Sequence, residues 1–268
     1  MHNTTRLRWT IFAAAVVCLL TLTGAAGPPA AGTSQAHAPQ LVLWAWERPE
    51  SLLFADSRQI GVAFLAESIF LDQQPVLRPR LQPLSVSRNT PLIAVVRLEA
   101  TPRAPGTPGG TYTATVAQWI ANTAREPQVQ AVQIDFDATR SQRAFYRALL
   151  AQVRPLLPTA TTLSITALGS WCLGDDWLGG LPIDEAVPML FRMGADRQNI
   201  LRALATGDDF REPLCRISIG VSTDEPWPAV PGASGFATAG WPGRRVYVFN
   251  PHPWTKASFE AVLGKLTP

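Results

Sequence analysis

Two aspartates that are two residues apart stand in a short apolar segment, residues 132–138 (VQIDFDA). In a strand, successive side chains point to opposite faces, so Gln133, Asp135 and Asp137 would share one face. Neighbours on one face lie about 7 Å apart, close enough for each carboxylate to disfavour ionisation of the other. Such a pair can hold a proton near neutral pH and perform general acid–base chemistry.

Other predicted strand ends carry side chains that could bind a ligand beside this pair. A second carboxylate is expected from Asp224 or Glu225, which follow a predicted strand. Indole rings stack on the C–H face of a sugar, and acids, amides and guanidinium groups bind its hydroxyls. The predicted ligand-binding residues are therefore Trp44, Trp46, Glu47, Arg97, Trp171, Arg192, Asn250 and Trp254.

The same residues have structural interpretations. The two aspartates could form buried ion pairs with Arg97 and Arg192, because structural ion-pair networks also perturb acids. The tryptophans of the first strand could fill the core, which is the commoner role of that residue type. Asp184 and Glu185 precede a predicted strand, so we expect them on the surface or in a cap at the end opposite the acids.

Eight apolar runs bounded by Gly, Pro and polar residues predict eight strands. Helical patterns follow several of them, and this repetition implies parallel pairing. We predict an α/β fold, a single (β/α)8 TIM-like barrel, with reactive groups at the carboxyl ends of the strands. A doubly wound open sheet is the alternative, without a Gly-rich phosphate loop to support it. The runs are 41–46, 61–65, 92–98, 132–137, 163–167, 187–192, 217–221 and 245–249.

The pattern is irregular after the second strand. Residues 70–91 contain four prolines where a helix would stand, which predicts an extended arm or hairpin. Helices are expected over 113–123, 141–157, 197–206 and 258–266. In the second of these, Ser141 is the expected N-cap, and the expected buried stripe is Phe145, Leu149, Val153 and Leu156.

The N-terminal segment is typical of a secretory signal. Arg6 and Arg8 precede a largely apolar stretch that ends at Ala26, and no acid occurs in it. We predict cleavage after Ala26, a Pro/Ala-rich spacer over 27–40 and one domain over 41–268. An uncleaved anchor is the alternative, since the stretch falls slightly short of the ~20 apolar residues that span a bilayer. Either way we expect an exported protein, periplasmic or secreted.

Charge and histidine content exclude several partners. The net charge is +3, and removing residues 1–26, with two arginines and no acid, leaves +1 (3 − 2). This balance, without a basic stripe, argues against nucleic acid. His252 alone follows the spacer, so neither a zinc triad nor a serine–histidine nucleophile is expected. We expect no metal, no cofactor, and a monomer that contacts a membrane only through an uncleaved N-terminus.

Two cysteines, Cys172 and Cys215, follow the signal segment. An even number in an oxidising compartment ordinarily suggests a disulfide. On the predicted strands, however, Cys172 follows the end of one strand and Cys215 lies at the start of another, near opposite ends of the barrel. Bonded α-carbons lie within about 7 Å, so we do not expect this pair to form.

Seven longer motifs run through the chain from Leu41 to Thr255: LVLWAWERPE, GVAFLAESIF, VQIDFDATRSQRAFYRALL, LSITALGSWCLGDDWL, DEAVPMLFRMG, GVSTDEPW and RVYVFNPHPWT. They resemble a bacterial exported family catalogued as domain of unknown function 3142, which implies export and no established activity. More loosely, the acid pair resembles that of chitinase-like family 18 glycoside hydrolase barrels, whose fourth strand ends in aspartates followed by an acid glutamate. Asp135 and Asp137 match those aspartates, but Thr139 stands where the glutamate belongs.

Two functional classes follow from these observations. The first is an exported glycoside hydrolase-like enzyme acting on an envelope or extracellular glycan. In it Asp137 is the general acid, Asp135 tunes it, and Asp224 or Glu225 supplies the second carboxylate. The second is a non-catalytic barrel of the cell envelope that binds a glycan or a partner through the same residues.

Overall fold

The computed structural model describes residues 40–55, 60–100, 110–207, 209–228 and 243–266. The predicted signal segment, and the spacer apart from Gln40, lie outside the described residues. No helix in the described part is both long and apolar enough to cross a membrane.

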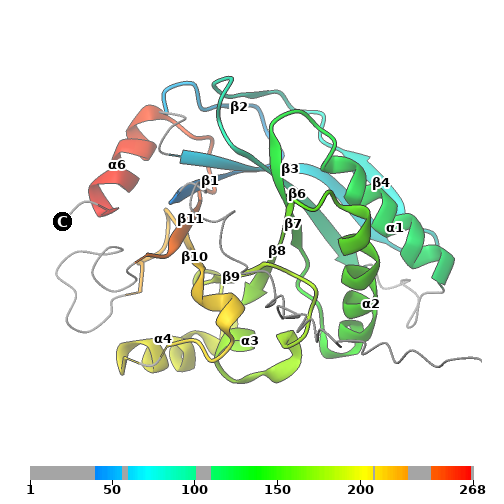
Figure 1. The fold of residues 1–268 in the computed structure, drawn as a ribbon. Helices are drawn as coiled ribbons and strands as arrows, with labels where there is room; N and C mark the ends of the chain where they lie inside the picture. Colours follow the sequence, from blue (N-terminus) through cyan, green and yellow to red (C-terminus); the bar gives the residue numbers. More distant parts are fainter. Residues whose placement is uncertain (1–39, 56–59, 101–109, 208, 229–242, 267–268) are drawn as a thin grey trace, which may run out of the picture. The chain divides into compact units, whose positions relative to one another are not determined.

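Eight parallel strands close into a barrel, so the predicted fold is confirmed (Figure 1). The first strand pairs with the last and with the second strand of the barrel: Leu41 lies opposite both Val246 and Ile60. The barrel strands, in order around the ring, are β1 (Leu41–Ala45), β3 (Ile60–Leu71), β6 (Leu92–Ala100), β7 (Val129–Asp135), β8 (Thr162–Leu168), β9 (Glu185–Met189), β10 (Ser218–Ser222) and β11 (Arg245–Phe249).

Helices cover the outside of the barrel (Figure 1). They are α1 (Gly110–Thr123), α2 (Arg143–Val153), α3 (Gly169–Gly174), α4 (Arg197–Ala205) and α6 (Lys256–Leu266). Short 3₁₀ turns extend or precede several of them: η2 (Arg140–Gln142), η3 (Arg154–Leu156), η4 (Asp176–Leu178), η5 (Gly194–Asp196) and η6 (Pro213–Arg216). The four predicted helices are therefore confirmed as α1, α2, α4 and α6, with shifted ends.

The start and the buried stripe of the α2 region differ from the prediction. Thr139, not Ser141, is the N-cap of the η2 turn, and its backbone N–H donates to the side-chain oxygen of Gln142 at 2.8 Å. The buried side of α2 consists of Tyr146, Leu149, Leu150 and Val153. Leu156 is 43% exposed, because the helix gives way to a 3₁₀ turn at Arg154 and the register of its faces changes there.

The predicted extended arm is a hairpin. Strand β3 continues past the barrel and turns back as β4 (Val76–Pro79), which pairs with it antiparallel. The chain then forms β5 (Leu84–Ser85), which pairs in parallel with β2 (Glu50–Ser51). Arg80 ties this arm to the barrel, since its guanidinium donates to the carbonyls of Trp46 and Arg48, each at 2.6 Å.

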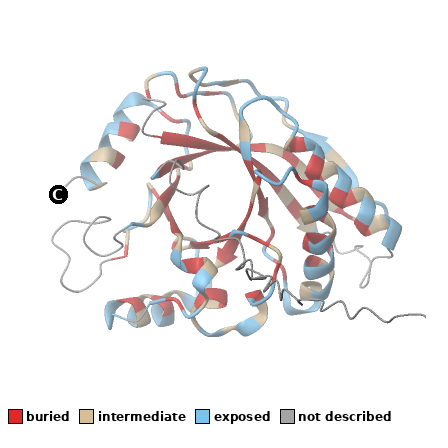
Figure 2. Cartoon of the chain, viewed as in Figure 1, coloured by how far each residue is buried: buried red, intermediate tan, exposed pale blue. Residues whose placement is uncertain are grey.

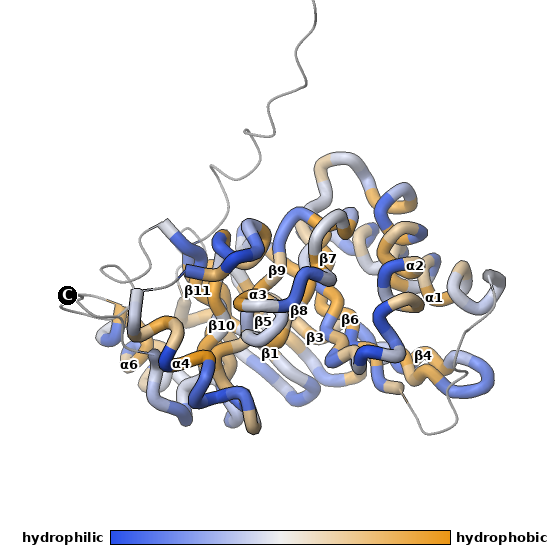
Figure 3. Tube along the Cα trace, turned by 90° about the horizontal axis from the view of Figure 1, so that it is seen from below, coloured by the Kyte–Doolittle hydropathy of each residue, from blue (hydrophilic) through white to orange (hydrophobic). Residues whose placement is uncertain are grey.

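The hydrophobic core has two layers, one on each side of the strands. The predicted alternation in β7 is confirmed: Val132 and Ile134 pack outward with Phe136, toward the helices, and Gln133 points into the lumen. Figure 2 shows the barrel strands buried over most of their length, and Figure 3 shows the hydrophobic residues concentrated along them. The lumen layer comprises Val42, Trp44, Ala63, Ile93, Val95, Ala131, Val187 and Tyr247.

The expectation that the two cysteines stay apart is wrong. Cys172 and Cys215 form a disulfide, with their α-carbons 5.8 Å apart. Helix α3 carries Cys172 away from the end of β8, and the segment before β10 folds against it. The backbone N–H of Arg211 donates to the Cys172 carbonyl at 2.9 Å. The order of the strands predicts where each strand lies but not the path of the segments between strands. The predicted distance between the two cysteines was therefore too large.

Glu67 is a buried acid in the middle of β3, within the sequence GVAFLAESIF. It lies at an irregularity in the pairing of β3 with β6, and its buried oxygen Oε1 has no hydrogen-bond partner among the described residues. Burial raises the pKa of this carboxyl from 4.5 to about 7. A group with a raised folded-state pKa stabilises the fold most when it is protonated.

We therefore expect the stability of the protein to fall as the pH rises from 4.5 to about 7. The loss from Glu67 should be about 3 kcal/mol, since each pKa unit corresponds to about 1.4 kcal/mol. Glu67→Gln should remove this loss, so that the variant gains on the wild type as pH rises. Denaturant unfolding across this range measures it, with exposed Glu126→Gln as the control. Parallel curves for wild type and Glu67→Gln would contradict the assignment.

Candidate active site

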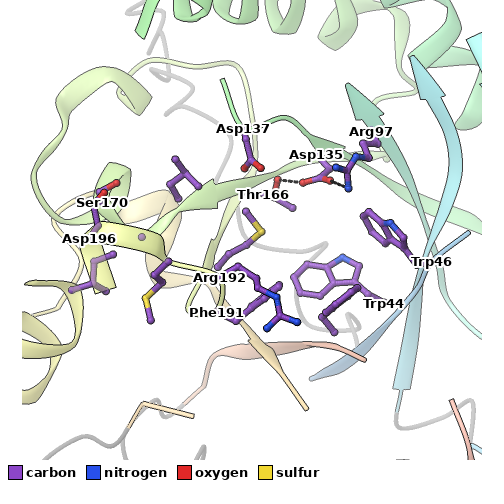
Figure 4. A pocket seen from close by; sticks show the side chains of 16 residues that line it. Trp44, Trp46, Arg97, Asp135, Asp137, Thr166, Ser170, Phe191, Arg192 and Asp196 are labelled. Atoms are coloured by element: carbon purple, nitrogen blue, oxygen red, sulfur yellow. Dashed lines mark hydrogen bonds and ion pairs between the residues drawn. The ribbon is translucent and has the colours of Figure 1, made fainter. Parts of the chain in front are cut away.

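A pocket of about 280 Å³ opens at the carboxyl ends of the barrel strands (Figure 4). Six of its lining residues were predicted from the sequence: Trp44, Trp46, Arg97, Asp135, Asp137 and Arg192. They come from β1, β6, the end of β7 and the segment after β9, and the closure of the barrel brings them together.

The other lining residues were not predicted from the sequence. Thr166 shares the lumen-facing side of β8 with Ser164, a signal that alternation alone could have revealed. Phe191 and Asp196 lie in the segment after β9, which the prediction counted partly as strand. The missed lining residues are Thr166, Leu168, Gly169, Ser170, Met189, Phe191, Met193, Asp196, Ile200 and Phe249.

Asp135 is held in place at the carboxyl end of β7. The Thr166 hydroxyl donates to its Oδ1 at 2.7 Å, and the Arg97 guanidinium lies 3.8 Å from its Oδ2 (Figure 4). Arg97 also pairs with Glu99 at 3.0 Å and lies over the Trp46 ring. Burial raises the pKa of Asp135, the Thr166 hydrogen bond opposes this rise, and the charge of Asp137 adds to it.

Asp137 lies just beyond the strand, where its side chain is exposed at the mouth of the pocket. Partial burial of its carboxyl group raises its pKa, and Arg97 opposes the rise. From the sequence, repulsion between the two acids was the expected cause of a raised pKa. Desolvation is instead the larger cause for both, because protein atoms displace water around the carboxyl groups.

Asp224 and Glu225 do not line the pocket; they bind Arg192. The Arg192 guanidinium contacts Asp224 at 2.7 Å and also pairs with Glu225, which binds Arg197 at 2.8 Å. Hydrogen bonds from Arg192 and Ser222 lower the pKa of Asp224. Burial alone would raise the pKa of Glu225, but hydrogen bonds from the backbone and side chain of Arg192 lower it. Both acids are therefore suited to orient Arg192.

Arg192 itself has a left-handed backbone conformation, with φ of 52°. This region is uncommon for residues other than glycine, and such strain concentrates at functional sites. The backbone N–H of Arg192 donates to Glu225 at 3.0 Å, which helps to hold this conformation. The two acids thus fix both the backbone and the guanidinium of an arginine at the pocket.

Four other predicted ligand-binding residues lie away from the pocket. Trp171 packs edge-on against Trp177 in the outer core. The Trp254 indole N–H donates to the Trp44 carbonyl at 2.8 Å, so Trp254 supports the pocket from behind. Asn250 is buried and accepts a hydrogen bond from Thr223, and Glu47 is exposed beside the hairpin arm.

A chain of buried hydrogen bonds positions the Trp44 ring at the floor of the pocket. The indole N–H donates to Gln133 Oε1 at 2.8 Å, and Gln133 Nε2 donates to the Ser164 hydroxyl at 3.2 Å. Ser164 donates in turn to Glu185 Oε2 at 3.0 Å. Contrary to the expected surface position, Glu185 lies within β9 with its side chain 2% exposed.

The two ends of this chain fix the direction of its bonds, because the indole N–H of Trp44 can only donate and the carboxylate of Glu185 can only accept. A carboxylate only accepts hydrogen bonds, so Ser164 must donate to it and has its oxygen free to accept from Gln133. That arrangement turns the amide oxygen of Gln133 toward Trp44. Arg245 at 2.8 Å and the Tyr247 hydroxyl at 2.9 Å supply the remaining donors to Glu185. Compensation of this kind is required for a buried charge.

We expect Gln133→Leu to lower the free energy of unfolding by about 2 kcal/mol, because the indole N–H of Trp44 loses its buried acceptor. Gln118→Leu, the same change at an exposed position of α1, should alter it by less than about 0.5 kcal/mol. Denaturant unfolding of both variants measures the difference. Equal losses would show that the Trp44 bond contributes nothing specific.

Within the described residues, no group of three or more His, Cys, Asp or Glu side chains is arranged to hold a metal ion.

Two solved structures resemble this chain. The first is an endo-beta-N-acetylglucosaminidase from Cordyceps militaris, with a TM-score of 0.47, 9% identity, and coverage of 88% of this chain and 93% of that one. The second is the chitinase domain of the spore coat protein CotE from Clostridium difficile, with a TM-score of 0.39, 15% identity, and coverage of 78% and 64%.

Among curated proteins, none matches this sequence. A family model does match, over residues 88–197, and its description is domain of unknown function (DUF3142). The matched part includes β6, β7 and β8, which carry Arg97, Asp135 and Thr166. The resemblance to this family is thus confirmed over residues 88–197.

Proposed function

We propose that this protein is a glycoside hydrolase-like enzyme that acts on a glycan in the barrel pocket, with Asp137 as its general acid. The observation that carries the proposal is the placement of two carboxyl groups with raised pKa in one pocket with aromatic walls. A raised pKa keeps a carboxylic acid protonated closer to neutral pH, as proton donation to a leaving group requires.

The pocket walls suit a sugar ring. Phe191 and Phe249 are stacked with an interplanar angle of 5°, and Trp46 meets Phe249 edge-on. Apolar faces of this kind pack against the C–H groups of a sugar, while Arg97, Arg192 and Ser170 offer donors to its hydroxyls. The volume of about 280 Å³ lies near the lower limit of ligand pockets and fits a single sugar unit better than a chain.

In the proposed step, Asp137 gives its proton to the glycosidic oxygen and the bond from that oxygen to the anomeric carbon breaks. Water supplies the hydroxyl to the anomeric carbon, and its remaining proton goes to a second carboxylate. Asp196 is a third acid in the pocket lining, beside Asp135 and Asp137, and is our candidate for this role. Asp224 and Glu225 are bound to Arg192 instead. Asp135 keeps its position through the hydrogen bond from Thr166, and burial with the opposing charge of Arg97 sets the pKa of Asp137.

Asp137→Asn should leave the fold and ligand affinity intact and lower turnover by roughly 10²–10⁴-fold, the usual effect of a positioned proton donor. Product analysis on a panel of oligosaccharides that bind the wild type measures it. Asp135→Asn tests the structural alternative; because the partner Arg97 is 40% exposed, loss of that ion pair should lower the free energy of unfolding by about 1 kcal/mol or less. Unchanged turnover in Asp137→Asn would exclude it as the acid.

A non-catalytic glycan- or partner-binding barrel is the second candidate. Two observations favour it. Thr139 occupies the position at which chitinase-like family 18 hydrolases carry the glutamate that acts as the general acid. Asp224 and Glu225, in addition, form ion pairs with Arg192. In this case the wild type would bind oligosaccharides without releasing products. The variants Asp137→Asn and Asp135→Asn would then differ from the wild type in binding alone.

We also propose that the protein is exported, to the periplasm or the medium of a bacterium. The basic and apolar pattern that ends at Ala26 supports this, as does the disulfide, which is typical of oxidising compartments. Expression of the full chain in a bacterial host, followed by N-terminal sequencing, should give a protein that begins near Gly27. A cytosolic product that still begins at Met1 would refute the proposal.

A further inference from the structure

We propose that a second glycan-binding site lies outside the barrel, in a groove of about 550 Å³ between the β3–β4 hairpin and α1. The groove and the barrel pocket have no lining residue in common. The proposed ligand is a neutral polysaccharide chain. Because binding in the groove needs no acid, this inference does not depend on hydrolysis in the pocket.

One wall of the groove comes from a single face of α1. Tyr112 and Trp119 are seven residues apart, so they lie two turns apart on the same side of the helix, at a separation of about 10 Å along its axis. Both rings are only partly buried. Two aromatic rings at this spacing can stack on different units of one sugar chain, and Thr111 and Thr115 place hydroxyls beside them.

The other wall comes from the hairpin turn and carries the amides of Gln73 and Gln74. Both glutamines are exposed, and neither side-chain amide has a hydrogen-bond partner in the described part of the chain. An amide has both donors and an acceptor and so matches the hydroxyl groups of a sugar. No charged side chain lines the described groove, which favours a neutral ligand over an anionic one.

Contacts between the two walls hold the groove open in a defined shape. The Tyr112 hydroxyl donates to the Asp72 carbonyl at 3.0 Å, which joins α1 to the hairpin. Tyr112 also packs edge-on against Phe145 of α2. Within the turn, the backbone N–H of Gln73 donates to the Asp72 carboxylate at 2.7 Å. A preformed groove loses little conformational entropy when it binds a ligand.

The position of the groove suggests what it does. Both walls follow the carboxyl ends of barrel strands, β3 for the hairpin and β6 for α1, and β4 lies beside α1 in Figure 1. The pocket opens at the same end of the barrel. A long chain bound in the groove would therefore be retained at the end of the barrel that carries the acids, which raises its effective concentration there.

Affinity electrophoresis tests the proposal, with native gels that contain β-glucan, xylan, galactomannan or dextran. At least one of these neutral polysaccharides should retard the wild-type protein. Trp119→Ala should weaken that retardation, with an increase in Kd of about tenfold for the loss of one stacking contact. Gln73→Ala with Gln74→Ala should weaken it as well. Gln130→Ala, at an exposed position at the amino end of β7, is the matched control and should migrate like the wild type.

The variant Asp137→Asn separates this proposal from the proposed hydrolysis. Retention in the gel should survive in Asp137→Asn, whether or not the pocket is catalytic. Circular dichroism of Trp119→Ala shows whether its fold is kept; if it is lost, the glutamine double variant decides. Three results would contradict the proposed binding site in the groove. They are no retardation of the wild type in any gel, equal retardation of all folded variants, or a loss of retardation in Asp137→Asn alone.

Discussion

The buried carboxylate of Glu185 is the constraint on which the interior of this barrel depends. A closed barrel of eight strands has room in its lumen only for side chains, and a charge placed there must be compensated. Arg245, Tyr247 and Ser164 surround Glu185 with donors. The bond from Ser164 continues to Gln133 and ends at the indole ring that forms the floor of the pocket.

At the mouth of the barrel, burial and ion pairing likewise determine the state of the acidic side chains. Asp135 and Asp137 have raised pKa values because neighbouring protein atoms remove water from their carboxyl groups. Asp224 and Glu225 have lowered pKa values because Arg192 binds both. One pair of acids is thereby suited to hold a proton, and the other is suited to stay ionised and to hold an arginine.

Local sequence patterns predicted the architecture well. The period-two alternation of β7 identified its two faces, and the lumen-facing position of Gln133 follows from it. Prolines between 70 and 91 predicted an interruption of the strand–helix repeat, which is the β3–β4 hairpin. The predicted ends of the strands were less accurate, because the end of a strand depends on its hydrogen bonds to neighbouring strands and these are not visible in the local sequence. For β9 this error placed Glu185 on the surface and counted Arg192 as strand.

The sequence by itself determined the eight strands, the faces of β7 and six residues of the pocket, since these follow from short-range periodicity and from the rule that barrel sites lie at carboxyl ends. Only the tertiary structure decided which distant side chains meet. It paired Cys172 with Cys215 and engaged Asp224 and Glu225 with Arg192. It also buried Glu185 beneath Trp44. Such contacts depend on the path of the segments that connect the strands and on which of several possible partners lies closest to a side chain. Local sequence patterns predict neither.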